Sequence, residues 1–228
     1  MVRYARLGAP SSRRTARDRA LLSEAERERY RRLPPEKRPP FLAAHALVRR
    51  TLSHYAERTP AEWHFAPDAL GKPEIIDPQP GEKLSFSLSH TRGLVACAVT
   101  WASPVGIDAE CAEARRPYAD LAGRVLAAGE RRDLDALPEA DQGDRFLDYW
   151  TLKEAHLKAR GTGIRARLAA LEFRLEGEAG AECLAEPGFA PVEGAWHYLR
   201  LCPSPVHRLA VAFACRAAPR WEVSEEGP

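Results

Sequence analysis

Long apolar runs are missing from this chain of 228 residues, and so is any paired arrangement of cysteines. No stretch approaches the roughly 20 apolar residues that a transmembrane helix needs, and the N-terminus lacks the apolar core of a secretory signal. The five cysteines are scattered, odd in number and without a CxxC pair, which argues against a zinc site or a disulfide scaffold. We therefore expect a globular cytoplasmic protein that does not bind membranes.

Lysine is scarce as well. Lysine and arginine together number 34, but only five of these residues are lysines, namely Lys37, Lys72, Lys83, Lys153 and Lys158. Residues 1–32 contain ten arginines against four acidic residues, although the net charge of the whole chain is +2. Such a segment could contact nucleic acid, a phosphorylated ligand or an acidic protein, or could be a solvated, partly disordered start.

The chain contains an internal repeat. Five residues recur with the same identity at one common offset: Leu22 and Leu126, Glu26 and Glu130, Arg27 and Arg131, Leu33 and Leu137, and Pro34 and Pro138. Each half continues with a helical pattern and ends in a β-like run, at 94–101 and 208–215. Chance similarity is the alternative, but five matches at one offset favour a duplication. We predict an α+β fold of two similar halves, residues 1–103 and 104–228, with a ligand cleft where they meet near 104–110.

The remaining pattern predicts several elements. In chain order they are a helix opened by a Ser23–Glu26 capping box, a helix that starts at Pro39-Pro40, a strand at 84–88, a turn at 89–93, a bridge between the halves at 104–110, a helix over 146–159, a loop or frayed hairpin at 176–194, and a loose tail over the last dozen residues.

Two motifs carry the chemistry. In Val105-Gly106-Ile107-Asp108-Ala109-Glu110 an extended chain would place Asp108 and Glu110 on one face, where they could hold a hard cation such as Mg²⁺. Alone, this triplet is equally consistent with two solvated acids. In the helix over 146–159, Trp150, Glu154 and Lys158 form one stripe. Glu154 and Lys158 could be an ordinary surface pair, or could serve a metal and a phosphate.

Two further turns hold polar residues. Ser87-Leu88-Ser89-His90-Thr91 could line an anion-binding concavity, although a lone turn histidine is more often bonded to backbone. Gly71-Lys72-Pro73 fixes one of the scarce lysines at a turn.

The chain resembles the 4'-phosphopantetheinyl transferases, specifically their larger, Sfp-type branch. The resemblance is carried by four motifs in matching order and spacing: G-K-P, S-H-T, G-I-D-A-E and W-T-L-K-E-A-H-L-K. The resemblance covers about residues 20–215. It implies a pseudo-dimeric α+β fold and an enzyme, of holo-[acyl-carrier-protein] synthase type. The implied reaction moves the phosphopantetheine arm of coenzyme A to a serine of an apo acyl or peptidyl carrier protein and releases adenosine 3',5'-bisphosphate.

The resemblance also implies roles for single residues. Asp108, Glu110 and Glu154 would ligate Mg²⁺ in the second half, and Glu154 or metal-bound water would take the serine proton. Further residues would bind coenzyme A, mostly from the first half: Lys158, Lys72, Ser89, His90, Arg27 and Arg29, with Arg49 as a weaker candidate. Where the family has a lysine-rich pair, this chain has Glu26-Arg27-Glu28-Arg29, which leaves the individual arginines open.

The implied partner is an acidic carrier protein, for which a rim of Arg115, Arg116, Leu121 and Val125 is a hypothesis. The loop at Gly161-Thr162-Gly163 could move. We expect a monomer that does not bind nucleic acid. The main alternative is a metal-dependent nuclease or phosphodiesterase, although such sites usually place the lysine two residues from the acid on one strand. A non-catalytic module that binds acidic partners would leave the acid–lysine arrangement unexplained.

Overall fold

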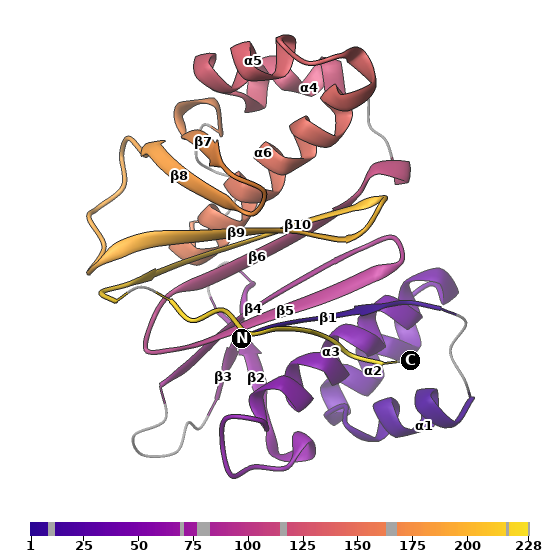
Figure 1. Cartoon of the computed structure of the whole chain (residues 1–228). Helices are drawn as coiled ribbons and strands as arrows, with labels where there is room; N and C mark the ends of the chain where they lie inside the picture. Colours follow the sequence, from indigo (N-terminus) through magenta and orange to yellow (C-terminus); the bar gives the residue numbers. More distant parts are fainter. Residues whose placement is uncertain are drawn as a thin grey trace. The chain divides into compact units, whose positions relative to one another are not determined.

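The protein is described here from a computed structural model that covers residues 1–8, 12–68, 71–76, 83–114, 118–162, 168–217 and 219–227. Contacts divide it into unit 1, Met1–Ala102 with Trp221–Pro228, and unit 2, Ser103–Arg220. Each unit combines helices with a sheet, which confirms the predicted α+β class (Figure 1). The predicted division at 1–103 and 104–228 differs from these units in the last residues of the chain, which lie in unit 1.

Unit 1 is built on a four-stranded sheet in the order β11-β1-β5-β4. Strand β1 runs parallel to β11, and the other neighbours are antiparallel. The strands are β1 Val2–Arg6, β4 Leu84–Thr91, β5 Leu94–Trp101 and β11 Val223–Glu225, with a separate hairpin of β2 Phe65–Pro67 and β3 Pro73–Ile75. The helices are α1 Ser12–Ala20, α2 Glu24–Arg32 and α3 Arg38–Leu52, with short 3-10 turns at Pro35–Lys37 and Pro60–Glu62.

Helix α3 covers the unit 1 sheet by contacts with β1, β4 and β5. Prolines occupy its first turn, where no backbone N–H is needed, and its apolar residues recur at helical spacing. The core between α3 and the sheet contains Leu47, Val48, Leu52, Trp63, Val95 and Val99, all nearly inaccessible to solvent. This is the helix-on-sheet layer that the pattern at 41–55 and 94–101 predicts.

Unit 2 is built on a three-stranded antiparallel sheet in the order β6-β10-β9. Its strands are β6 Val105–Cys111, β9 Ala195–Ser204 and β10 His207–Cys215, with a hairpin of β7 Glu172–Glu176 and β8 Gly180–Ala185. Its helices are α4 Tyr118–Val125, α5 Ala128–Asp135 and α6 Glu139–Arg160, with 3-10 turns at Ala112–Ala114 and Leu168–Ala170. Helix α6 packs on β6 and β10, much as α3 packs on its own sheet.

The repeated glutamates occupy matching places in the two units. Glu26 closes the capping box of α2 by accepting the Ser23 N–H at 2.8 Å, and it also contacts the buried Arg49 guanidinium at 2.7 Å and His45 at 2.9 Å. Glu130 accepts the Ala127 N–H at 2.8 Å and lies 2.7 Å from the buried Lys153 ammonium. Each pair joins the start of a short helix to the second half of the following long helix.

Three expectations were wrong in detail. Residues 89–91, expected in a turn, continue β4, and the reversal is the two-residue turn Arg92-Gly93, where Gly93 has a φ of 79°. Residues 105–110, expected as a bridge, form most of β6, because they pair with residues 208–213 of β10. The loop or hairpin predicted at 176–194 forms a hairpin only in the first part of that range, within β7 and β8.

The C-terminal segment, expected as a loose tail, forms β11. Its charged side chains attach it to unit 1, because Arg6 pairs with Glu225 at 2.7 Å and Arg50 pairs with Glu226 at 2.6 Å. Arg50 also reaches Asp18 of α1 at 2.7 Å. The sequence pattern missed this strand because its three residues, Val223–Glu225, are too few to show a period. None of the described helices has the length and apolarity required to cross a membrane.

Ionised Glu26 should stabilise unit 1. Burial alone would raise its pKa, but the contact with His45 and the charge of Arg49 outweigh burial and lower the pKa from 4.5 to about 2. The stabilisation is therefore complete above pH 4.5 and is lost as the pH falls toward 2. We expect Glu26→Gln to reduce the free energy of unfolding by about 3 kcal/mol at pH 7, because it leaves Arg49 buried and unpaired, and by less at pH 3.

The measurement is urea unfolding of both proteins at several pH values, followed by circular dichroism. The control is Glu28→Gln, on the same helix, whose partners Arg31 and Arg32 are largely exposed. It should change stability by less than about 1 kcal/mol. A difference between wild type and Glu26→Gln that does not vary with pH would contradict the interpretation.

Candidate functional site

The site of unit 2 begins on the face of β6 that lies against α6. A Cβ atom built on Gly106 would lie 1.9 Å from the carbonyl oxygen of Ala155 and 2.5 Å from the backbone nitrogen of Ala159. Gly106 therefore faces α6, and the period of two along a strand places Asp108 and Glu110 on the same side. The sequence correctly predicted that these two carboxylates share a face.

Glycine at position 106 allows the backbones of strand and helix to touch. Any side chain there would collide with main-chain atoms of α6, which cannot move aside as a flexible side chain can. In the sequence, Gly106 stands out only as part of a motif, and its role in the packing of β6 on α6 was not predicted. Its spacing, two residues before Asp108 and four before Glu110, is the signal that it belongs to the same face.

The predicted stripe on α6 also meets β6. Lys158 donates to the Asp108 carboxylate at 2.6 Å and to the carbonyl oxygen of Ile107 at 3.0 Å. One end of the stripe is thus fixed beside Asp108. At the other end, the indole N–H of Trp150 donates to Glu110 at 3.1 Å. Trp150 therefore positions a carboxylate, a role that the sequence stripe did not reveal.

Burial and mutual repulsion define the electrostatics of the three carboxylates. Burial, followed by the charge of Asp108, raises the pKa of Glu110 to about 7 against the opposing effects of Trp150 and Lys158. Burial and the charge of Asp108 also raise the pKa of Glu154, and Lys158 opposes the rise. The negative charge of Asp108 is therefore close enough to affect both glutamates, with Lys158 as the nearby positive charge.

The donor chemistry fits a hard divalent cation. Carboxylate oxygens are the ligands that Mg²⁺ prefers, and the buried Oε1 atom of Glu154 has no hydrogen-bond partner among the described residues. In the described part of the chain, however, no group of three or more His, Cys, Asp or Glu side chains is arranged to hold a metal ion. The assignment of Asp108, Glu110 and Glu154 as Mg²⁺ ligands thus stays a prediction.

The other predicted site residues belong to unit 1, and most of them lie at its surface. On α2, Arg27 pairs with Glu24 at 3.3 Å, and Arg29 is exposed with its guanidinium over the Phe41 ring. On β4, Ser89 is buried and His90 is exposed. Lys72 is half-buried, and its backbone N–H donates to Asp68 at 2.8 Å.

Arg49 differs from these residues because it is fully buried. Its guanidinium donates to Glu26 at 2.7 Å, donates to the carbonyl oxygen of His45 at 3.2 Å and lies over the Phe65 ring. In the structure its charge thus serves the fold of unit 1, as that of Lys153 serves unit 2. These contacts argue against the expected role of Arg49 in nucleotide binding.

The hypothetical carrier rim is not formed as expected. Val125 is buried and Leu121 packs against the core of unit 2, so these side chains do not offer an apolar surface. Arg115 and Arg116 lie outside the described residues, as does Gly163 of the loop expected to move. Gly161 caps α6 in the left-handed conformation, with a φ of 68°.

Comparison with known proteins agrees with the site. The family model of the 4'-phosphopantetheinyl transferase superfamily matches residues 104–214, which contain β6 and α6. The 4'-phosphopantetheinyl transferase HetI of Nostoc sp. (strain PCC 7120) is 35% identical over 196 residues, which make up 86% of this chain and 79% of HetI. The 4'-phosphopantetheinyl transferase Sfp of Bacillus subtilis (strain 168) is 29% identical over 68% of this chain and 72% of Sfp.

The chain belongs to the 4'-phosphopantetheinyl transferase family. This confirms the predicted enzyme class and the resemblance to the Sfp-type branch. The comparisons give no support to the alternative of a metal-dependent nuclease.

We expect Gly106→Ala to reduce the free energy of unfolding by about 1–3 kcal/mol or more, because α6 must move away from β6 to admit the methyl group. The control is Gly123→Ala, at an exposed position of α4 where a Cβ meets nothing within 4 Å. That change should be neutral or stabilising by up to about 1 kcal/mol, since alanine is the better helix former. Urea unfolding measures both effects, and equal stability of the two variants would contradict the close-contact interpretation.

Proposed function

We propose that this enzyme transfers 4'-phosphopantetheine from coenzyme A to a serine hydroxyl of an apo acyl or peptidyl carrier protein and releases adenosine 3',5'-bisphosphate. The observation that carries the proposal is the cluster of Asp108, Glu110, Glu154 and Lys158, formed by β6 and α6 inside the segment that matches the family. The names of HetI and Sfp state the transfer of 4'-phosphopantetheine for those relatives.

Asp108, Glu110 and Glu154 would hold Mg²⁺ together at the pyrophosphate of coenzyme A. The ion would supply charge stabilisation for the phosphate oxygens as the leaving group departs. Trp150 would keep Glu110 in place through its indole N–H.

Lys158 would bind phosphate oxygens from the position it holds beside Asp108. Its ammonium is about one-third exposed and has a flexible stem, so it can contact Asp108 and a bound phosphate together. In unit 1, Lys72, His90, Arg27 and Arg29 would bind the nucleotide phosphates, with Ser89 nearby on β4. We assign Arg49 to the fold rather than to the nucleotide.

The transfer itself joins the serine oxygen to the phosphorus that carries pantetheine. The bond from that phosphorus to the bridging oxygen breaks, the bond's electron pair leaves with adenosine 3',5'-bisphosphate, and the serine proton goes to a base. Burial and the charge of Asp108 raise the pKa of Glu154 toward the range of an effective general base. Glu154 is therefore the side chain that we propose as this base or as the group that orients it.

Glu154→Gln should abolish modification of the carrier, by at least about a hundredfold, because it removes a ligand charge and the proposed base. Intact-mass spectrometry of an apo carrier incubated with enzyme, coenzyme A and Mg²⁺ measures the added phosphopantetheine. Glu139→Gln, at the exposed start of the same helix, is the control and should retain full activity. An unfolded Glu154→Gln in circular dichroism would assign the residue to the fold instead, and an active variant would refute its proposed role.

Mg²⁺ alone should bind the wild-type protein and not Asp108→Asn. The substitution removes one charge from the cluster while it keeps the shape of the side chain and a carbonyl oxygen for Lys158. Isothermal titration calorimetry with MgCl₂ measures the difference, which we expect to be at least about tenfold in affinity. Equal binding to both proteins would exclude Asp108 as a ligand without bearing on the family assignment.

A further inference from the structure

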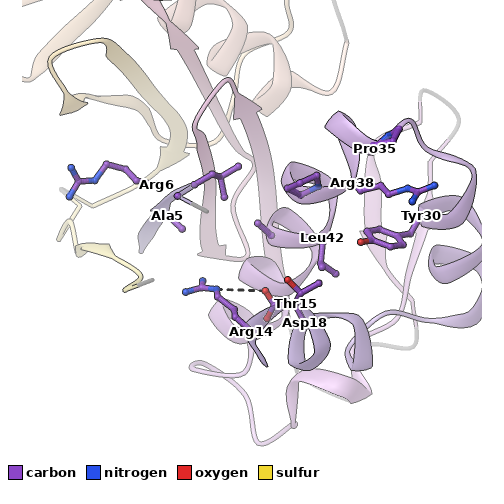
Figure 2. Close-up of a pocket in the computed structure, with 13 residues that line it drawn as sticks. Ala5, Arg6, Arg14, Thr15, Asp18, Tyr30, Pro35, Arg38 and Leu42 are labelled. Atoms are coloured by element: carbon purple, nitrogen blue, oxygen red, sulfur yellow. Dashed lines mark ion pairs between the residues drawn. The ribbon is translucent and has the colours of Figure 1, made fainter. Parts of the chain in front are cut away.

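Unit 1 contains a cavity of about 620 Å³ that the proposed reaction does not use. It lies between α1, β1 and the region where α2 leads into α3, and Figure 2 shows the side chains that line it. Its volume is in the range of small-molecule sites, which span roughly 300–1,000 Å³. Most of the lining is apolar, from Ala5, Leu7, Pro35, Pro39, Leu42 and Ala43.

The charges around the cavity are balanced except at one point. Arg6 and Arg14 pair with Glu225 and Glu226, and Asp18 pairs with Arg50. Arg38 also lines the cavity, and within the described residues no carboxylate pairs with it. The cavity therefore has one positive charge left without an acidic partner.

Arg38 is held in place by neutral groups. Its Nε atom donates to the carbonyl oxygen of Leu33 and its Nη2 atom to that of Arg31, both at 2.9 Å. Its guanidinium lies over the ring of Tyr30, 5.8 Å from the centroid. These contacts use two of the five N–H groups and fix the plane of the guanidinium, so that binding an anion would cost little further ordering.

Tyr30 adds a second polar group at the same point. Figure 2 shows its hydroxyl end turned toward Leu42, on the apolar side of the cavity. The hydroxyl has no hydrogen-bond partner among the residues that the structure describes, and the guanidinium of the exposed Arg19 lies over the Tyr30 ring, 5.6 Å from its centroid. Arg38 and Tyr30 thus contribute a guanidinium and a hydroxyl to the lining of a mostly apolar cavity.

We propose that this cavity binds an organic anion with an apolar body, of the medium-chain carboxylate type. The carboxylate pairs with the remaining N–H groups of Arg38 and accepts from Tyr30, and the hydrocarbon chain lies against Leu42 and Ala43. Guanidinium groups match carboxylates in geometry, and the apolar lining favours a chain over a free inorganic ion. The proposal is independent of the transfer reaction, because it concerns a different set of side chains.

The test is calorimetric titration of the full chain with decanoate, below its micelle concentration and without coenzyme A or Mg²⁺. Decanol and acetate, which carry only the chain or only the charge, should bind at least about tenfold more weakly. Arg38→Gln should weaken decanoate binding at least about tenfold and Tyr30→Phe about threefold. Ala43→Phe, which fills the cavity, should abolish it.

Arg32→Gln is the matched control, because Arg32 is exposed on α2 and pairs only with Glu28 among the described residues. It should bind decanoate as the wild type does. If Arg38→Gln fails to fold, the decanoate affinities of Tyr30→Phe and Ala43→Phe still test the proposal. No binding of decanoate to the wild type, equal binding of decanol, or unchanged binding to Ala43→Phe would each overturn the proposal.

Discussion

The contact between the backbones of β6 and α6 is the constraint on which the candidate site depends. At Gly106 the strand comes so close to Ala155 and Ala159 that no side chain fits between them. Across this contact Lys158 lies 2.6 Å from Asp108, and burial together with the charge of Asp108 raises the pKa of Glu154. The positive charge of Lys158, which α6 holds beside Asp108, offsets the repulsion among these carboxylates.

In each unit, a buried glutamate–cation pair attaches a short helix to the long helix that follows it. In unit 1 the cation is Arg49 and in unit 2 it is Lys153, and both are fully buried. The glutamate also accepts a backbone N–H at the start of the short helix, so one side chain satisfies two otherwise costly groups. This shared geometry supports the duplication and gives the buried Arg49 a structural role that corresponds to that of Lys153.

The two units carry different parts of the proposed chemistry. The segment that matches the family, residues 104–214, holds the acids and Lys158, whereas the proposed nucleotide contacts belong to unit 1. In unit 1, Arg50 forms ion pairs with both Asp18 of α1 and Glu226 near the C-terminus, and so connects these two segments. Carboxylates of the C-terminal segment also pair with Arg6 and Arg14 at the cavity beside α1. Arg38 differs from these arginines because no carboxylate pairs with it among the described residues.

Local patterns in the sequence determined most of the secondary structure and the composition of the site. The alternation in 84–88, the apolar runs at 94–101 and 208–215 and the stripe of Trp150, Glu154 and Lys158 all depend on neighbours in the chain, and periodicity records such neighbours. The shared face of Asp108 and Glu110 followed from the same rule. The family motifs then indicated the enzyme class, which the comparisons confirmed.

The tertiary structure alone decided which partners these residues meet. The burial of Arg49, the hydrogen bond from Trp150 to Glu110 and the pairing of β11 with β1 join residues that lie far apart in the chain. No local period encodes such contacts, because each depends on how two elements pack. The sequence by itself therefore determined the residues of the site and their faces, and the packing of α6 on β6 decided that they meet.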